Sequence, residues 1–277
     1  MKHRTFLEYR RYRYLKVATL LALISIFVYA GYTFPVGRYG GTAVGYVLGT
    51  ISALLVVWLM WLGVQKRRYK ANVSGIQGWL SAHVYIGGAL IVVATLHAGF
   101  QVGWNIHTLA YVLMLIVIFS GFFGVFAYLR FPALMTANMG EETLDSLVQK
   151  IADLDREIRR TAMSMSDEIN AVAMESIKNT RIGGGVFAQF LHRPSNCPTK
   201  RAAIFLERIG KTLKGDQQKQ NRDLYSLMLR KEKWVDRARA DVRFKALLDL
   251  WLYLHVPVSF ALLAALAAHI ISVFFYW

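Results

Sequence analysis

The sequence predicts an all-α membrane protein: a bundle of five transmembrane helices, with a helical cytoplasmic insertion between the fourth and the fifth. Two observations predict this fold class. Hydrophobic residues make up 55% of the 277 residues, and the charged residues are gathered into blocks that long uncharged runs separate. Each run is at least as long as the ~20 apolar residues that one helix needs to cross a bilayer.

Four uncharged runs contain the five predicted spans. The run at residues 71–129 is long enough for two spans, and it has a turn-like break at residues 99–107. The predicted spans cover residues 17–34, 43–64, 78–99, 108–129 and 247–276. We expect the first span to remain in the protein, because its apolar stretch is longer than that of a cleavable signal peptide.

The predicted organisation has three parts. Residues 1–129 carry a basic tail and four spans, residues 130–246 form the insertion, and residues 247–277 contain the fifth span. Of the 33 Lys and Arg residues, all but Arg38 fall in the tail, in segment 65–70 or in the insertion, which five spans place on one face. By the positive-inside rule this face is cytoplasmic, so the N-terminus is cytoplasmic and the C-terminus lies outside a plasma (inner) membrane. The net charge of +16 then belongs to a cytoplasmic surface, and no motif that reads nucleic acid accompanies it.

The insertion is predicted to be helical. Apolar residues recur at three- and four-residue steps from Leu144 to Ile158, which is typical of an amphipathic helix. Further helices are predicted at Asp167–Lys178, from about Arg201 with a break near Gly215, and at Leu224–Lys245 toward the fifth span. Such a domain either caps the membrane helices or forms a basic docking surface for a soluble, acidic redox partner. We favour docking, because the insertion would lie beside the cytoplasmic end of the third and fifth spans.

Two spans carry histidines at the same spacing. The third contains HVYIGGALIVVATLH from His83 to His97, and the fifth contains HVPVSFALLAALAAH from His255 to His269. A step of 14 residues returns the second ring to within about 40° of the first and moves it about 21 Å along the helix. Since both spans run in the same direction, His83 lies at the depth of His255 and His97 at the depth of His269.

Two such pairs, stacked across the membrane, predict a specific cofactor. Each pair could hold one iron porphyrin between two neutral imidazoles, which predicts two haem b groups with bis-histidine ligation. Gly87 and Gly88 would let a flat ring approach the backbone, although small residues also serve helix packing in membranes. Ala261, Ala264, Ala265, Ala267 and Ala268 have the same two interpretations in the fifth span.

Other interpretations of the histidines stay open. Interhelical packing is one, and a relay that transports a divalent metal is another, although Asp249 is the only acidic residue at these spans. His107, in the predicted outer loop, is a neighbour of the outer haem, a quinone contact or neither. The single cysteine, Cys197, excludes a Cys-ligated iron–sulfur cluster within this chain, and Cys197 with His192 gives too few ligands for zinc.

Paired H-x13-H helices around one intervening span resemble the dihaem transmembrane cytochromes b. The placement on the third and fifth spans resembles the ferric reductase and NADPH oxidase membrane domain, and the spacing resembles the haem-binding half of respiratory cytochrome b. The resemblance implies that His83, His97, His255 and His269 are the axial haem ligands. We expect this chain to lack the flavin and nicotinamide domain of the oxidases, and it has no Pro-Glu-Trp-Tyr quinol-site motif.

The expected function is therefore transmembrane electron transfer. Paired carboxylates, an activated nucleophile and a nucleotide motif are all missing from the sequence, so chemistry at either end is expected from partner proteins. We expect the membrane subunit of a larger redox complex with an iron–sulfur, flavin or multihaem subunit, which links a quinone pool or an outer partner to a cytoplasmic redox protein. A stand-alone quinone or metal reductase is the alternative, and quinone stays open as a further cofactor.

Overall fold

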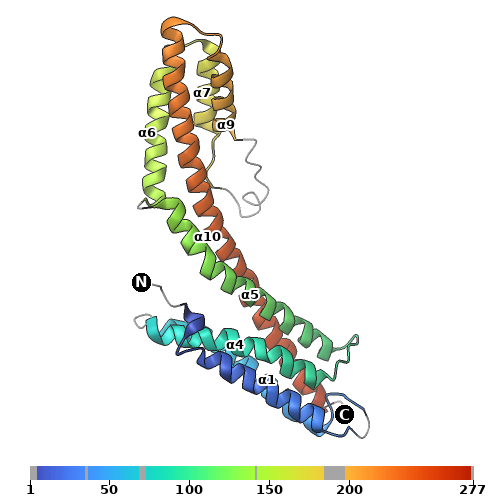
Figure 1. Cartoon of the computed structure of the whole chain (residues 1–277). Helices are drawn as coiled ribbons and strands as arrows, with labels where there is room; N and C mark the ends of the chain where they lie inside the picture. Colours follow the sequence, from blue (N-terminus) through green and yellow to red (C-terminus); the bar gives the residue numbers. More distant parts are fainter. Residues whose placement is uncertain (1–4, 35–36, 69–72, 141, 184–196, 276–277) are drawn as a thin grey trace. The chain divides into compact units, whose positions relative to one another are not determined.

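The computed structural model describes residues 5–34, 37–68, 73–140, 142–183 and 197–275. Contacts within the chain define two compact units. The membrane unit consists of Met1–Leu129 and Trp251–Trp277, and the insertion unit consists of Arg130–Leu250. Helices α5 and α10 contribute to both units (Figure 1).

The secondary structure of the membrane unit is helical in its described residues. A short 3-10 helix, η1, covers Phe6–Glu8. The other elements are α1 (Arg13–Gly31), α2 (Ala43–Met60), α3 (Leu62–Arg68), α4 (Val73–Ala98), the first part of α5 (Ile106–Met139) and the last part of α10 (Gly215–Phe275). In the part of the chain that the structure describes, five helices are long and apolar enough to cross a membrane. The predicted all-α architecture with five candidate spans is thereby confirmed for the described residues, while the orientation and the cytoplasmic placement of the insertion stay predictions.

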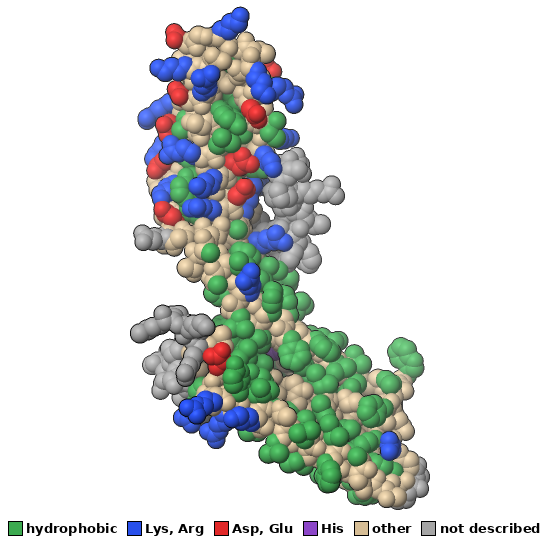
Figure 2. Space-filling model, viewed as in Figure 1, with side chains coloured by type: hydrophobic (Ala, Val, Ile, Leu, Met, Phe, Trp, Pro, Cys, Tyr) green, Lys and Arg blue, Asp and Glu red, His purple; other side chains and the backbone are tan. Residues whose placement is uncertain are grey.

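The outer surface of the membrane unit is apolar. Figure 2 shows hydrophobic side chains over most of its visible face. Phe27 of α1 is 80% exposed and Phe274 of α10 is 75% exposed. Apolar side chains at this density are costly in water but suit the hydrocarbon of a bilayer, where the helices satisfy their own backbone hydrogen bonds.

The interior of the membrane unit lies around α4. Helices α1 and α2 both pack against α4, and Figure 1 shows α1 alongside α4. One apolar core joins four helices through Val56 and Leu59 of α2, Leu90 and Ala94 of α4, Met114 and Ile118 of α5, and Leu262 of α10. Lipid gives no hydrophobic drive for helix association, so membrane helices are held together by close packing. Small residues permit this close approach.

Hydropathy located the apolar segments, but it did not predict where the helices that contain them begin and end. Helix α5 continues to Met139, ten residues past the predicted end of the fourth span, and remains helical through Pro132. Helix α10 runs from Gly215 to Phe275 and joins the predicted 224–245 segment to the fifth span. Charged residues end an apolar span, but Lys, Arg and Glu are good helix formers and do not end a helix.

The second predicted span contains a break that hydropathy did not indicate. Helix α2 ends at Met60 and α3 begins at Leu62, with Trp61 between them. The backbone N–H of Trp61 bonds to the carbonyls of Val57 and Trp58. The bond to Val57 is the regular bond of an α-helix and the bond to Trp58 is that of a 3-10 turn, so the chain tightens locally at Trp61.

The insertion unit is a small helical bundle. Its helices are α6 (Leu144–Ala162), α7 (Asp167–Asn179), α9 (Pro198–Ile209) and the first part of α10, which lie alongside one another in Figure 1. They share a core that includes Leu154 and Ile158, Ile169 and Ala173, Ala202 and Leu206, and Leu224 and Met228. The predicted helices of the insertion and the break before Gly215 are confirmed. The residues 184–196, with His192, lie outside the described residues.

The start of α6, which the sequence left open, is fixed by a capping box. The hydroxyl of Thr143 accepts from the backbone N–H of Ser146, and the hydroxyl of Ser146 accepts from the backbone N–H of Thr143. Serine takes the place of the usual Glu or Gln at this position, which explains why the sequence signal is weak.

Candidate functional site: two histidine pairs in the membrane unit

The structure brings one of the predicted histidine pairs into ring contact. The ring centres of His97 in α4 and His269 in α10 are 6.0 Å apart. His83 and His255 lie toward the other end of the same two helices, where His83 contacts α2 and His255 contacts α5. All four side chains are partly buried. The spanning part of α10 therefore runs in the same direction as α4, with one histidine pair toward each end.

Helix α2 holds both histidines of α4. The Nδ1 atom of His83 lies 3.1 Å from the carbonyl oxygen of Leu59, and the Nδ1 atom of His97 lies 2.7 Å from the carbonyl oxygen of Gly45. A carbonyl oxygen can only accept, so Nδ1 of each ring carries the proton. In a neutral imidazole the lone pair then lies on Nε2, which is the nitrogen left to bind a metal.

The two acceptors on α2 match the two histidines in spacing. Leu59 and Gly45 are 14 residues apart, as are His83 and His97, and the chain direction of α2 is opposite to that of α4. Because an equal number of residues gives equal rise and rotation in both helices, one antiparallel register serves both histidines.

Glycines allow the close approach of α2 to the His97 ring. A Cβ atom at Gly49 would lie 2.6 Å from Cε1 of His97, and one at Gly40 would lie 3.1 Å from the same atom. No real side chain tolerates the first of these distances without displacement. The ring of His97 is thus seated directly against the backbone of α2.

Helix α5 holds His255 through a serine. The hydroxyl of Ser120 donates to the carbonyl of Val117 at 2.8 Å and lies 2.8 Å from Nδ1 of His255. Two oxygen atoms at 2.8 Å need a proton between them, so we assign the hydroxyl proton to the contact with Val117 and Nδ1–H of His255 as the donor to Ser120. With this assignment the ring has the same tautomer as His83 and His97, with the lone pair on Nε2.

The neighbourhood of His255 is closely packed against α5. Trp251, one turn before His255, donates from Nε1 to the carbonyl of Ser120 at 2.8 Å. A Cβ atom at Gly124 would lie 2.1 Å from the indole of Trp251, and one at Gly121 would lie 3.5 Å from Cε1 of His255. The two glycines give the indole and imidazole rings direct access to the α5 backbone.

The fourth histidine has another histidine as its partner. Nδ1 of His269 lies 2.5 Å from Nδ1 of His107, and the two ring centres are 4.4 Å apart with the planes at 86°. His107 belongs to the first turn of α5, inside the segment that the sequence predicted as a loop. One of the two facing nitrogens must donate and the other must accept.

The spacing of the rings fits a metal between them. A metal–imidazole bond is about 2 Å long, and the ring centre lies roughly 1 Å beyond the nitrogen, so two rings on opposite sides of one metal have centres about 6 Å apart. The observed separation of His97 and His269 is 6.0 Å, with the ring planes at 78°. Two rings in edge-to-face contact have centres about 4.5–7 Å apart, so this separation fits direct ring contact as well as a metal site.

The glycines of α4 leave some space beside the helix. Gly87, one turn after His83, is buried, yet a Cβ atom added to it would meet nothing within 4 Å. At Gly88 the added atom would lie 3.9 Å from Phe122. On α10, Ala265 is buried, whereas Ala261, Ala264, Ala267 and Ala268 are exposed. Whether this space takes a flat ring stays a prediction.

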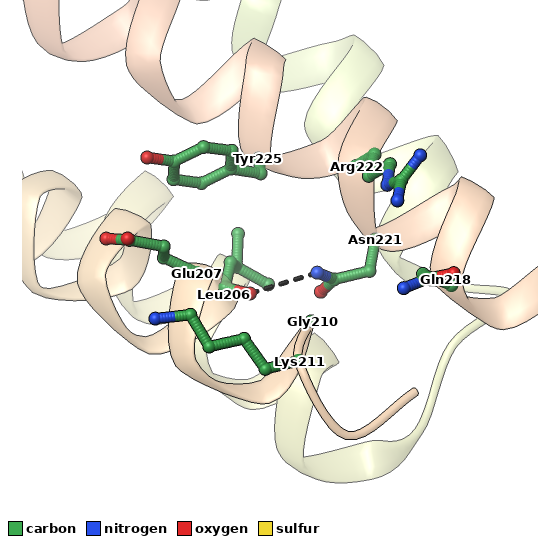
Figure 3. Close-up of a pocket in the computed structure, with 8 residues that line it drawn as sticks. All are labelled: Leu206, Glu207, Gly210, Lys211, Gln218, Asn221, Arg222 and Tyr225. Carbon is green, nitrogen blue, oxygen red and sulfur yellow. Dashed lines mark hydrogen bonds between the residues drawn. The ribbon is translucent and has the colours of Figure 1, made fainter. Parts of the chain in front are cut away.

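The insertion unit offers a shallower feature. A cavity of about 260 Å³ lies between α9 and α10 (Figure 3), and its lining includes Glu207, Lys211, Arg222 and Tyr225. The amide of Asn221 donates to the carbonyl of Leu206 at 2.9 Å across its base. This bond ties α10 to α9, and a structural role accounts for it.

The surface of the insertion unit carries both positive and negative charges. Lys, Arg, Asp and Glu side chains are intermixed over its visible face (Figure 2). Segment 130–250 contains 22 basic and 16 acidic residues, a net of +6. Most of the chain's net charge of +16 therefore belongs to the N-terminal tail and to segment 65–70.

Sequence reasoning missed the partners of the histidines. Leu59 and Gly45 act through backbone carbonyls, which every residue has, so no sequence signal marks them. Ser120 is one hydroxyl among several in the spans. His107 was noticed, but its position in a predicted loop hid its place on α5.

Comparisons with protein-family models, with curated proteins and with solved structures found no match to this chain. The resemblance to dihaem cytochromes b thus rests on the histidine pattern alone.

Proposed function

We propose that this protein is a dihaem b-type cytochrome that carries single electrons across a membrane. His83 and His255 would hold one haem, and His97 and His269 the other. The observation that carries the proposal is that Nδ1 of His83, His97 and His255 each lies within hydrogen-bond distance of an oxygen atom. With Nδ1–H as the donor in each contact, Nε2 of each ring presents its lone pair. Such acceptors orient metal-bound histidines and raise the basicity of the metal-binding nitrogen.

Packing alone explains this arrangement less well. A histidine that served only to join helices in a membrane would satisfy one hydrogen bond wherever a partner happened to lie. Here the two ligand helices each have an antiparallel neighbour, α2 for α4 and α5 for α10, and each neighbour contacts both histidines. The repeated use of Nδ1 indicates a common requirement at Nε2.

The residues of this chain would bind, orient and insulate the cofactor. Haem, when bound, supplies one-electron chemistry at its iron. The rise of α4 separates His83 from His97 by about 21 Å along the helix axis. Between them lies the apolar core of α2, α4, α5 and α10, with Leu90 and Met114 among its buried members. An apolar surrounding keeps water from the site and favours the iron state of lower charge.

The setting that fits best is a larger redox complex in a plasma (inner) membrane, with the insertion unit on the cytoplasmic side. The insertion unit would then provide a docking surface for an iron–sulfur, flavin or multihaem subunit, and a quinone or an outer partner would exchange electrons at the opposite end.

Isolation of the full chain in mild detergent tests whether the protein belongs to a larger complex. A co-purifying redox protein supports a subunit, and an isolated chain that reduces quinone or metal supports a stand-alone reductase.

Difference spectra of histidine variants test the ligand assignment. The full-length chain, His83→Ala, His269→Ala and the double variant His83→Ala/His255→Ala would be purified, and dithionite-reduced minus oxidised absorbance recorded. We expect two b-type haems in the parent and one in each single variant. The double variant should also keep one haem, because both substitutions fall in one pair. His192→Ala, outside the spans, serves as the control that keeps both haems.

The rival function gives a different result in the same preparations. Absence of a haem band from the parent chain, with bound zinc or copper that His83→Ala and His269→Ala both lose, would replace electron transfer by transport of a divalent metal. Loss of both haems in His83→Ala/His255→Ala but of one in His83→Ala would overturn the pairing of the ligands.

A further inference from the structure

His269 differs from the other three histidines in the kind of group that faces its Nδ1. His83 and His97 donate to carbonyl oxygens and His255 donates to a hydroxyl oxygen, but the Nδ1 of His269 faces the Nδ1 of His107 at 2.5 Å. Either ring could donate in an isolated pair. The choice decides whether His269 presents the same nitrogen as the other three.

We propose that His107 is a positioning residue that accepts the hydrogen bond of His269 and so fixes the tautomer and orientation of that ring. The proposal rests on the proposed function, in which Nε2 of His269 binds haem iron. With Nε2 committed to the metal, the proton of His269 lies on Nδ1, and Nδ1 of His107 must carry the lone pair that receives it. His107 would then act through His269 and would not itself touch the metal.

The register of α5 against α10 independently points to this role. Gly121 lies against the ring of His255, with 3.5 Å from an added Cβ atom to Cε1. His107 precedes Gly121 by 14 residues, as His255 precedes His269 by 14. In antiparallel helices the same step brings the same face into contact, so His107 meets His269 as Gly121 meets His255. The α5 helix thus serves both histidines of α10, as α2 serves both histidines of α4.

The first turn of α5 holds His107 in place. The side-chain oxygen of Asn105 accepts from the backbone N–H of Thr108 at 2.9 Å, which is the bond of an N-cap residue. The hydroxyl of Thr108 accepts from the backbone N–H of Gly103 at 3.0 Å. One turn further, the hydroxyl of Tyr111 lies 2.8 Å from that of Thr95 in α4. A capped and anchored turn is what a positioning side chain requires.

The chemical consequence is a stronger metal-binding nitrogen at His269. An acceptor on Nδ1–H increases the electron density that the imidazole can donate through Nε2, as in the carboxylate–histidine arrangements of other metal sites. A more strongly donating ligand stabilises the oxidised iron and lowers the reduction potential of that site. Removal of the acceptor should raise it.

The test compares two substitutions of His107 in the full-length, haem-containing chain. His107→Leu keeps the volume but has no acceptor, while His107→Asn places an amide oxygen near the former position of Nδ1. Redox titration of absorbance gives the midpoint potential of each haem, and electron paramagnetic resonance of the oxidised chain reports the ligand field. The haem that disappears in His269→Ala identifies the one held by His97 and His269.

We expect His107→Leu to raise the potential of that haem, or to release it, and to leave the other haem unchanged. His107→Asn should return the potential and the resonance signal toward those of the parent. Ser120→Ala provides the reciprocal comparison, because it should alter only the haem held by His83 and His255.

Three results would overturn the proposal. An unchanged potential and resonance signal in His107→Leu would show that His269 needs no acceptor. Loss of the haem in both His107→Leu and His107→Asn, with its retention in His269→Ala, would make His107 the ligand. A parent chain with no haem would contradict the proposed electron-transfer function itself and remove the basis for a role of His107. The first two results would overturn only the role of His107 and leave the electron-transfer function intact.

Discussion

The hydroxyl of Ser120 sets the tautomer of His255 through two consecutive hydrogen bonds. Its proton is committed to the carbonyl of Val117, so its oxygen is an acceptor for Nδ1–H of His255. A hydroxyl whose proton was free could either donate or accept. With its proton directed to the carbonyl of Val117, the hydroxyl of Ser120 can act only as an acceptor toward His255.

Replacement of Ser120 by alanine should change one haem only. With the acceptor removed, His255 donates less strongly through Nε2, so we expect the potential of its haem to rise by a few tens of millivolts, which corresponds to part of a hydrogen bond of about 1 kcal/mol. Redox titration of the full chain measures this shift. Ser259→Ala is the matched control, since among the described residues the hydroxyl of Ser259 bonds to the backbone carbonyl of His255. Equal shifts in both variants would contradict a specific role for Ser120.

A methyl group at Gly49 should disturb the His97 site. In Gly49→Ala the new Cβ would lie 2.6 Å from the His97 ring, so either the ring or helix α2 must move. We expect loss or weakened binding of the haem held by His97 and His269, measured as haem per chain. Gly63→Ala in α3, where an added Cβ meets nothing within 4 Å, should keep both haems. Full occupancy in Gly49→Ala would mean that the seat of His97 against α2 is not required.

At the scale of helices, the sequence predicted which segments span the membrane and which side chains share a face. The repeated 14-residue spacing of histidines is written in the sequence, and helix geometry converts it into two pairs. Hydropathy did not show the break at Trp61, because the residues on both sides of it are equally apolar. The carbonyl of Leu59 that lies 3.1 Å from His83 is one backbone carbonyl among many, so the sequence did not single it out.

A buried lysine joins three helices of the insertion unit. The side chain of Lys231 in α10 is fully buried and pairs with Asp155 of α6 at 2.6 Å. Its Nζ also donates to the carbonyl of Ser176 in α7 at 2.9 Å. In the interior the attraction between the two charges is offset by the cost of removing both from water, so the pair depends on both partners being present.

Removal of one partner alone should destabilise the protein. We expect Lys231→Met to cost about 3–5 kcal/mol of unfolding free energy, because Asp155 is left without its partner. Thermal unfolding of the full chain, followed by circular dichroism, measures this effect. Lys231→Met/Asp155→Leu should recover most of the stability, as an apolar pair of similar volume replaces the ions. A double variant as unstable as the single one would contradict this explanation.

At the scale of the whole molecule, the distribution of basic residues predicts which end of the spans faces the cytoplasm. Of the 33 Lys and Arg residues, Arg38 alone lies in a segment predicted to be outside. An odd number of spans then puts the insertion and the chain end after α10 on opposite sides. Hydropathy does not indicate which side of the membrane the insertion faces. That orientation is predicted from the charge distribution alone.

Reporter fusions test that orientation. Alkaline phosphatase, which is active only outside the cytoplasm, should be active when fused after Trp277 and inactive when fused within the insertion at Gly140. A fluorescent protein that folds only in the cytoplasm should show the reverse. Active phosphatase at Gly140 would invert the topology and move the docking surface of the insertion unit to the outer side.

The number of haems per chain tests the central claim most directly. A pyridine haemochrome assay on the purified full-length chain, combined with its protein concentration, gives this ratio without reference to partners, substrates or the direction of electron flow. Four histidines in two pairs predict two haem b per chain. A chain that folds and purifies without haem would contradict the account and leave the histidine pairs to a metal ion or to helix packing.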